Sequence, residues 1–183
     1  QVVCQYMQAP KRVHCQLVRH IFKYCRFNSY ALEYSSENDM ILRGWSDASY
    51  ANNQDFKSTG GSCFKLAGSL LSWSSNKQNI VALSTAESEL IALTAAAQEA
   101  IWMQTLLAEL GFPQVPTTIF EDNQACIALA KNPQNHKRTK HIQVRYFFIR
   151  QYLEDGLLDL KYCGTLEQLA DPFTKILPGH RLR

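Results

Sequence analysis

Residues 41–49, ILRGWSDAS, decide the fold of this chain, because they predict an apolar strand that carries an aspartate near its end. Trp45 and Asp47 are two positions apart, so their side chains share one face of the strand. A buried and unpaired aspartate is costly there, which favours a functional role for Asp47. A turn-starting aspartate at a strand end is the alternative. The segment therefore predicts a first strand that leads into a site.

Further strands and helices are predicted on the C-terminal side of this segment. Strand patterns cover residues 60–66 and 69–74, which Ala67-Gly68 joins as a hairpin, and residues 117–121 and 157–162. Helix patterns cover residues 84–97, residues 98–110 as a continuation or a second helix, residues 122–131, residues 142–154 and the tail from Leu169. This order predicts an α/β fold with a five-stranded mixed sheet, antiparallel at first, and helices on both faces.

A separate helix is predicted before the sheet, over residues 10–27, with apolar and basic side chains on different faces. The basic face fits a nucleic-acid backbone, and an ordinary solvated helix face is the alternative. The pattern changes at Met40. We therefore expect a helical connecting segment over residues 1–39 and the α/β domain over residues 40–183.

Composition limits the class of protein. The 183 residues are 46% hydrophobic, which is enough for one well-buried domain and excludes disorder. The net charge of +3 excludes a polycation, so local charge clusters matter more than the sum. The six cysteines form no CxxC pair and no zinc-finger spacing, which predicts free thiols, several of them buried, and an intracellular setting. No apolar run approaches the length of a membrane span.

The helix predicted from Ser84 offers two glutamates. Ser84-x-x-Glu87 matches a capping box, in which Glu87 accepts from the backbone N–H of Ser84. Glu89 lies on another face, above a small apolar stripe that faces the core. We therefore assign Glu89 to metal binding and keep Glu87 as the secondary candidate.

Two aspartates complete the acidic set. Asp122 ends a predicted strand and begins a helix, which is where α/β folds place their sites, although Asp is also a good helix N-cap. Asp171 precedes Pro172, so it either caps a helix with Pro172 in the first turn or lies within a helix that began near Gln168. Plain capping remains the alternative for both residues.

Carboxylates gathered without counter-charge repel one another, so such a quartet needs divalent cations or raised pKa values. Hard oxygen donors are what a pair of Mg²⁺ ions prefers. Two such ions can activate water and stabilise the leaving oxygen of a phosphodiester.

Six strings, in this order, resemble the ribonuclease H domain of copia-type LTR retrotransposons, at the C-terminal end of their Pol polyprotein. They are GWSDASYANN, KSTGGSCFKLAGSLLSWSSNKQ, ALSTAESELIAL, EDNQACIALAKNP, HKRTKHIQVRYFFIRQ and QLADPFTK. The resemblance runs from about Tyr6 to Lys175, and residues 5–35 resemble the segment that links the reverse transcriptase to this domain.

The resemblance implies an RNase H-like fold in which Asp47, Glu89, Asp122 and Asp171 are the catalytic and metal-binding set. It implies an endonuclease that hydrolyses the RNA strand of RNA–DNA hybrids with two Mg²⁺ ions, or Mn²⁺ as a substitute, leaving 5′-phosphate and 3′-hydroxyl ends. The implied protein partner is the reverse transcriptase domain of the same polyprotein. The resemblance implies no association with a membrane. The implied location is cytoplasmic, in virus-like particles.

Substrate contacts are expected from three regions. The basic cluster at residues 136–141 suits phosphates, with an exposed solvated turn as the alternative. The segment at residues 75–78 suits the DNA backbone, and the resemblance takes Asn123 and Gln124 to the minor groove of the hybrid. The residues assigned to substrate binding are Ser49, Lys77, Gln78, Asn123, Gln124, Lys137, Arg138, Lys140 and His141.

Two positions depart from the family pattern, and one loop departs from the pattern of cellular RNases H. Gln143 stands where relatives commonly carry Asp, and Phe147 where they often carry His. The loop before the last helix has no His, so Glu167 or no equivalent residue would assist product release. These departures leave open a silent hybrid-binding or structural domain. Another enzyme on the same fold, such as a DNA-strand transferase or an exonuclease, is the further alternative.

Overall fold

The computed structural model describes all residues except 1–2, 29, 36, 115, 133–139 and 179–183. The chain divides into two compact units, Gln1–Glu33 and Tyr34–Arg183. We expected the boundary between residues 39 and 40. The residues just before it belong with the larger unit, in which the Tyr34 hydroxyl donates to the carbonyl oxygen of Leu70 at 2.5 Å.

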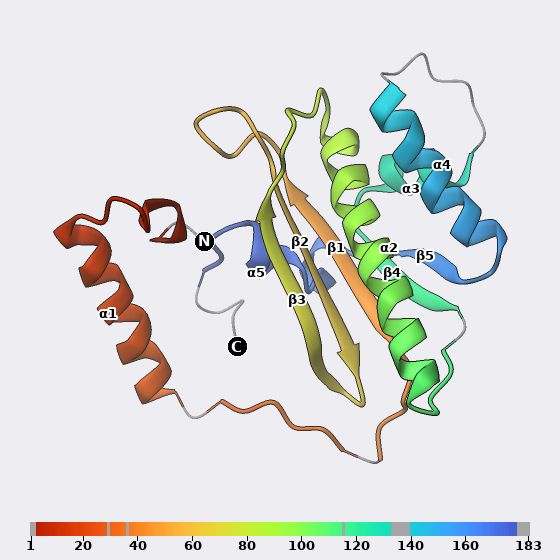
Figure 1. Ribbon diagram of the computed structural model, residues 1–183, viewed down its shortest axis with the longest axis horizontal. Helices are drawn as coiled ribbons and strands as arrows, with labels where there is room; N and C mark the ends of the chain where they lie inside the picture. The colour runs from red at the N-terminus through yellow and green to blue at the C-terminus, as the bar shows by residue number, and fades with distance from the viewer. Residues whose placement is uncertain (1–2, 29, 36, 115, 133–139, 179–183) are drawn as a thin grey trace. The chain divides into compact units, whose positions relative to one another are not determined.

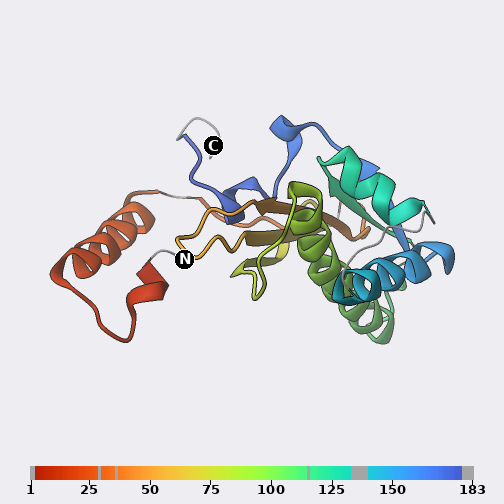
Figure 2. The same ribbon diagram turned by 90° about the horizontal axis from the view of Figure 1, so that it is seen from above.

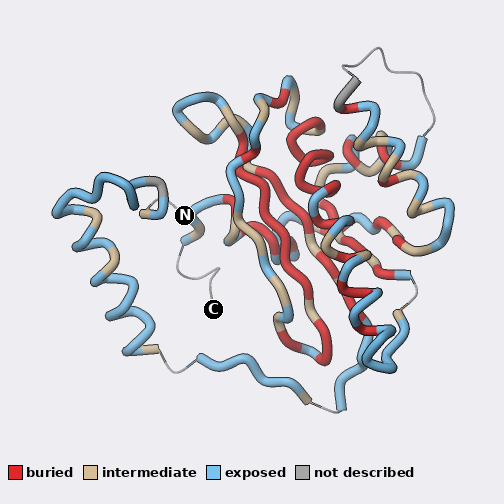
Figure 3. Tube along the Cα trace, in the orientation of Figure 1, coloured by how far each residue is buried: buried red, intermediate tan, exposed pale blue. Residues whose placement is uncertain are grey.

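The smaller unit holds a short 3₁₀ helix, η1 (Val3–Tyr6), and helix α1 (Arg12–Phe27). Helix α1 confirms the helix predicted over residues 10–27. The Lys11 backbone N–H donates to the His14 ring nitrogen Nδ1 at 3.0 Å and so closes the first turn. None of the described side chains of α1 is buried, and Figure 3 shows most of the helix as exposed. Its apolar stripe is therefore uncovered.

The larger unit is built on one five-stranded sheet, which confirms the predicted fold class. The strands are β1 (Arg43–Ser49), β2 (Thr59–Leu66), β3 (Ser69–Lys77), β4 (Thr117–Glu121) and β5 (Leu158–Tyr162). Their spatial order is β3-β2-β1-β4-β5, with β1, β2 and β3 antiparallel and β4 and β5 parallel to β1 (Figure 1). The sheet is mixed, as expected.

The hairpin between β2 and β3 turns at Ala67 and Gly68, as predicted. Both residues have positive φ angles, 50° and 80°, and this backbone matches the twist of the flanking strands. Strand β3 continues to Lys77, three residues beyond the predicted end at Ser74, because its last residues pair with β2 as far as Thr59.

Helices α2 (Thr85–Glu109), α3 (Gln124–Lys131) and α4 (Lys140–Glu154) follow the expected order. The two segments predicted over residues 84–110 form one continuous helix. The predicted C-terminal helix is only one turn, α5 (Asp171–Thr174), after a 3₁₀ turn, η2 (Thr165–Glu167).

Helix α2 is the core helix of the larger unit. Leu90 and Leu93 are fully buried, and each contributes about 2 kcal/mol of stabilisation. Among the described residues, this helix alone is long and apolar enough to cross a membrane. However, 61% of its apolar window is buried inside the fold, so packing on the sheet accounts for its composition.

Helices cover both faces of the sheet (Figure 2). Two adjacent glycines in β2 show which helix packs on each face. A Cβ added at Gly60 would lie 3.3 Å from the Ala92 Cβ of α2. A Cβ added at Gly61 would lie 2.7 Å from Thr174 Cγ2 of α5. Because successive residues of a strand face opposite sides, α5 lies across the sheet from α2.

One connection determines which edge of the sheet carries the predicted carboxylates. Strands β1 and β4 are parallel neighbours, so their carboxyl ends lie at the same edge. The chain leaves β1 toward β2 on one side, and β4 lies on the other side, so the strand order reverses at this point. Ligands of open α/β sheets bind at such switch points. The end of β1 carries Asp47, and Asp122 directly follows β4.

Candidate active site

Asp47 lies on β1 and is almost completely buried, with 2% of its surface exposed. Burial raises the pKa of its carboxyl group, and the hydrogen bond donated by the Thr174 hydroxyl opposes that rise. The Lys175 ammonium nitrogen lies 3.9 Å from Asp47 Oδ2. The alternative of an exposed turn-starting aspartate is wrong, because Asp47 lies inside the strand and pairs with Gly61.

Glu89 reaches the same edge from the first turns of α2. Burial, together with the negative charges of Asp47 and Asp122, raises its pKa to about 9. Its Oε2 atom is buried and has no hydrogen-bond partner among the described residues. No lysine or arginine among the described residues forms an ion pair with Glu89.

Glu87 has the capping role predicted for it. Its backbone N–H donates to the Ser84 hydroxyl at 3.2 Å, and its own carboxylate accepts from a backbone N–H at 3.0 Å. That N–H belongs to Leu83 rather than Ser84, one residue earlier than the capping box predicts. The carboxylate of Glu87 is thus engaged at the start of the helix.

The capping alternatives for the two aspartates are excluded by the helix ends. Asn123 is the N-cap of α3, where its side chain accepts from the Cys126 N–H at 3.0 Å, so Asp122 has no capping role there. Ala170 occupies the N-cap position of α5, and Asp171 is already its first residue. Asp171 is fully buried, and its Oδ1 lies 2.6 Å from the Lys175 ammonium nitrogen.

The carboxylates gather in two groups that share Asp122. In each group the carboxylate oxygens lie within 4.8 Å of one another, which is close enough for a divalent cation with modest contraction. The first group is Asp47, Asp122 and Asp171, and the second is Glu89, Glu121 and Asp122. The structure thus brings all four predicted carboxylates to one edge of the sheet, and their metal-binding roles remain a prediction.

The donor set fits divalent metal ions. All donors are carboxylate oxygens, which Mg²⁺ and Mn²⁺ prefer. Glu89 and Glu121 each keep one buried oxygen without a hydrogen-bond partner among the described residues, and a cation or a proton would compensate each of them.

Three residues of this cluster were missed from the sequence. Glu121 is fully buried beside Asp122, and burial, followed by the charge of Glu89, holds its pKa well above the usual range. Thr174 and Lys175 come from α5 and the residue after it. Burial lowers the pKa of Lys175, but its hydrogen bond to Asp171 and the nearby negative charges outweigh that effect and raise it. The i, i+4 spacing of Asp171 and Lys175 was the available signal.

The predicted substrate contacts on the β1 and β3 side differ in position. Ser49 ends β1 and is half-buried, and Lys77 ends β3, where its ammonium group lies 2.8 Å from Asp55 Oδ2. The Gln78 side chain is buried and donates to the carbonyl oxygen of Ser88 at 2.8 Å. Gln78 therefore joins the β3–α2 loop to α2, and it lines the same pocket as Lys77.

The remaining predicted contacts lie near the amino ends of α3 and α4. Asn123 is half-buried at the N-cap of α3, and Gln124 is exposed in its first turn. Lys137 and Arg138 lie outside the described residues. Lys140 and His141 are described only as the first residues of α4.

The departures from the family pattern lie outside both carboxylate groups. Gln143 and Phe147 are exposed on α4, and the Phe147 ring packs edge-on against Tyr146. Glu167 is exposed in η2. None of the three belongs to the cluster of carboxylates.

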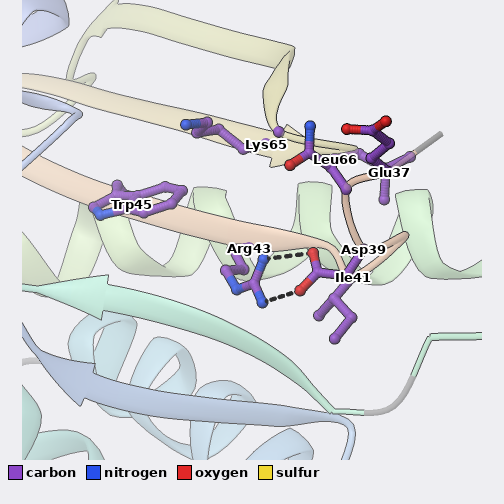
Figure 4. Close-up of a pocket in the computed structure, with 9 residues that line it drawn as sticks. Glu37, Asp39, Ile41, Arg43, Trp45, Lys65 and Leu66 are labelled. Atoms are coloured by element: carbon purple, nitrogen blue, oxygen red, sulfur yellow. Dashed lines mark hydrogen bonds and ion pairs between the residues drawn. The ribbon is translucent and has the colours of Figure 1, made fainter. Parts of the chain in front are cut away.

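Pockets adjoin the strands of the sheet at more than one place. A pocket of about 160 Å³ between β2, β3 and α2 is lined by Lys77 and by Arg145 of α4, a cation that the sequence did not indicate. A larger pocket of about 460 Å³ lies at the opposite end of β1 from Asp47. In Figure 4 the Arg43 guanidinium there faces both carboxylate oxygens of Asp39.

Retrotransposon sequences are similar to most of this chain. The Retrovirus-related Pol polyprotein from transposon TNT 1-94 of Nicotiana tabacum is 38% identical over 181 residues, 98% of this chain. The corresponding polyprotein from transposon RE1 of Arabidopsis thaliana is 35% identical over 176 residues, 94% of this chain. The chain spans 14% and 12% of the lengths of these relatives. No protein-family model matches it.

Solved structures show the same fold as the larger unit. LC11-RNase H1 in complex with an RNA/DNA hybrid aligns with 73% of this chain and 93% of its own, at a TM-score of 0.56 and 13% identity. The foamy viral protease-reverse transcriptase in complex with an RNA/DNA hybrid aligns with 92% of this chain and 22% of its own, at a TM-score of 0.55 and 19% identity. The fold is therefore RNase H-like.

Proposed function

This chain belongs to the copia-type retrotransposon Pol polyproteins, and on that premise we propose that it contains their ribonuclease H domain. This domain hydrolyses the RNA strand of RNA–DNA hybrids, as an endonuclease, during reverse transcription. One observation carries the proposal: four carboxylates, from β1, α2, the end of β4 and α5, meet at the switch-point edge of an RNase H-like sheet. Both structural neighbours described above were solved with an RNA/DNA hybrid.

The carboxylate cluster would hold two Mg²⁺ ions, with Mn²⁺ as a substitute. When bound, such ions supply an activated water and stabilise the charge on the leaving oxygen, which gives 5′-phosphate and 3′-hydroxyl ends. Asp47, Asp122 and Asp171 supply the donors of the first group, and Glu89 and Asp122 supply donors of the second.

The chain's own side chains prepare the site for this task. The Thr174 hydroxyl donates to Asp47 and fixes the orientation of its carboxylate. The Lys175 ammonium group contacts Asp171 and Asp47 and lowers the repulsion between them. Because the Lys175 side chain is 38% exposed, it can also turn outward to a substrate phosphate.

Substrate is held by groups on both sides of the cluster. Lys77 and Arg145 line one pocket, and paired cations of this kind attract a nucleic-acid backbone without regard to sequence. Ser49, Asn123 and Gln124 lie beside the carboxylates in sequence and contact the hybrid through its shape and 2′-hydroxyl groups. The basic residues Lys137, Arg138, Lys140 and His141 contribute further phosphate contacts.

The partner of this domain is the reverse transcriptase of the same polyprotein. The chain spans about a seventh of the length of the TNT 1-94 polyprotein, to which it is similar. The working location is the cytoplasm, inside virus-like particles, where reverse transcription generates the hybrid substrate.

Cleavage of an end-labelled RNA–DNA hybrid tests the proposal. The chain is incubated with Mg²⁺, with Mn²⁺ and with a chelator, alone and joined to its reverse transcriptase. Asp122→Asn is compared with Asp155→Asn, which alters an exposed aspartate outside the cluster. We expect the RNA strand to be cut only with metal, and the cut to disappear in Asp122→Asn alone.

Other outcomes separate the alternatives. Hybrid that is bound but never cut, with either protein, supports a silent hybrid-binding domain. Cleavage of duplex DNA at the rate of hybrid supports a different nuclease on the same fold.

A further inference from the structure

Glu121 is the last residue of β4 and is completely buried. Its Oε1 atom accepts from the backbone N–H of Asn123 at 3.2 Å, which shapes the turn from β4 into α3. Its Oε2 atom is buried and has no hydrogen-bond partner in the described part of the chain. A neutral side chain would satisfy the Asn123 N–H equally well, so this turn does not explain why a carboxylate is buried here.

The surroundings of Glu121 make its negative charge more costly. Glu89 and Asp122 can each place a carboxylate oxygen within 4.8 Å of it. The Oε2 atom of Glu89 is also buried without a partner. Within the described residues, no ion pair joins Glu89, Glu121 or Asp122 to a lysine or arginine, because Lys175 pairs with the other group.

We propose that Glu121 is a further carboxylate ligand for a divalent cation, held by Glu89, Glu121 and Asp122. The two carboxylate groups then form two adjacent cation positions, with Asp122 shared between them. This inference rests on the proposed function, because it adds a ligand to the same site. Its chemical basis is independent of the substrate: two unpartnered, buried oxygens face a third carboxylate, and only a cation or a proton can compensate them.

Glu121→Gln separates ligation from a purely structural role. Glutamine has nearly the same volume, and its Oε1 can still accept from the Asn123 N–H, so the turn is preserved. The substitution removes the negative charge and one oxygen donor. Glu109→Gln is the matched control, because Glu109 is exposed at the end of α2. Asp122→Asn is the positive control, because Asp122 belongs to both groups.

The experiment is a titration of the full chain with Mn²⁺. Calorimetry and the electron paramagnetic resonance signal of free Mn²⁺ measure the binding. We expect wild type and Glu109→Gln to bind two ions. In Glu121→Gln one of the two binding events weakens by about 10-fold to 100-fold while the other is retained. Asp122→Asn weakens both.

Two results would overturn the inference. Equal titrations of wild type and Glu121→Gln, with hybrid cleavage intact, would reject Glu121 as a ligand and leave the proposed function standing. If the wild-type chain binds no Mn²⁺ and cuts no hybrid, both the Glu121 inference and the proposed function are rejected. A melting curve in chelator shows whether each variant is folded before its titration is interpreted.

Discussion

The two ends of strand β1 carry aspartates in opposite circumstances. Just before β1, Asp39 is exposed, and its two oxygens accept from the Arg43 guanidinium at 2.8 and 2.6 Å (Figure 4). That hydrogen bonding lowers the pKa of Asp39. Near the other end, Asp47 is buried among carboxylates, and burial raises its pKa. An ion pair with matched charges thus lies at one end of β1. A cluster of carboxylates with too little positive charge lies at the other end.

The contrast shows how burial and charge divide the roles of acidic residues. Water as well as the partner compensates each charge of an exposed ion pair. Such a pair therefore contributes little to stability and does not require a bound cation. In the buried cluster, Lys175 is the cation that pairs with the carboxylates among the described residues, and it contacts only one group. The proposed cations would compensate the buried end, whereas the exposed end already has its partner. Four predictions test this difference.

The largest expected effect is on cleavage. Asp47→Asn should reduce metal-dependent hybrid cleavage by about a thousandfold or more, because it removes a ligand and several kcal/mol of transition-state stabilisation. Asp39→Asn should leave the rate unchanged. Initial rates with saturating Mg²⁺ measure both. Equal losses in the two variants would mean that the ends of β1 are not functionally distinct.

The next effect is on the pH dependence of stability without metal. Glu89 has a folded pKa of about 9 against an ordinary value of 4.5, so the folded state binds the proton more tightly than the unfolded state. Stability in chelator should therefore fall as pH rises from about 4.5 to about 9, by more than about 1 kcal/mol between pH 6 and pH 9. Urea unfolding at these pH values measures the slope.

Two variants sharpen this pH prediction. Glu89→Gln should flatten the slope, and saturating Mg²⁺ should do the same in wild type. Asp39→Asn should not change it, because the lowered pKa of Asp39 gives a contribution that is lost only as pH falls through that lowered value. A slope unaffected by Glu89→Gln would contradict the assignment.

A third prediction compares two glycines of the sheet. A Cβ at Gly44 would lie 2.5 Å from the buried Phe64 ring, so Gly44→Ala should destabilise the fold by about 1–3 kcal/mol without changing Mn²⁺ affinity. A Cβ at Gly61 would meet Thr174 and Phe173, so Gly61→Ala should displace α5 and slow cleavage about tenfold or more. Melting curves and Mn²⁺ titrations distinguish them. The reverse pattern would argue against α5 as the support of Asp171.

The smallest expected effect is at the exposed pair. Arg43→Lys replaces a two-pronged contact by a single charge, and it should change stability by about 0.5 kcal/mol or less, with cleavage intact. Urea unfolding in 1 M salt should reduce even this difference. A loss above about 2 kcal/mol would show that the Asp39–Arg43 pair is structurally more important than its exposure indicates.

Much of the fold was predictable because its signals are local. Period-two patterns, the Ala67-Gly68 turn and the Ser84 cap depend on neighbours along the chain, and the corresponding elements were confirmed. The N-cap residues were less predictable. Asn123 rather than Asp122 caps α3, and Ala170 precedes α5. Such one-residue choices depend on where tertiary contacts anchor each helix.

The sequence alone determined the order of strands and helices and the candidate carboxylates Asp47, Glu89, Asp122 and Asp171, because hydrophobic period and residue chemistry are written along the chain. Only the tertiary structure decided that Glu121 joins them, that Lys175 compensates one group, and that Gln78 is tied into the fold. Those facts depend on strand pairing and on which residues exclude water around a charge. Burial at that edge, rather than residue type, separates the clustered carboxylates from the exposed pair at the other end of β1.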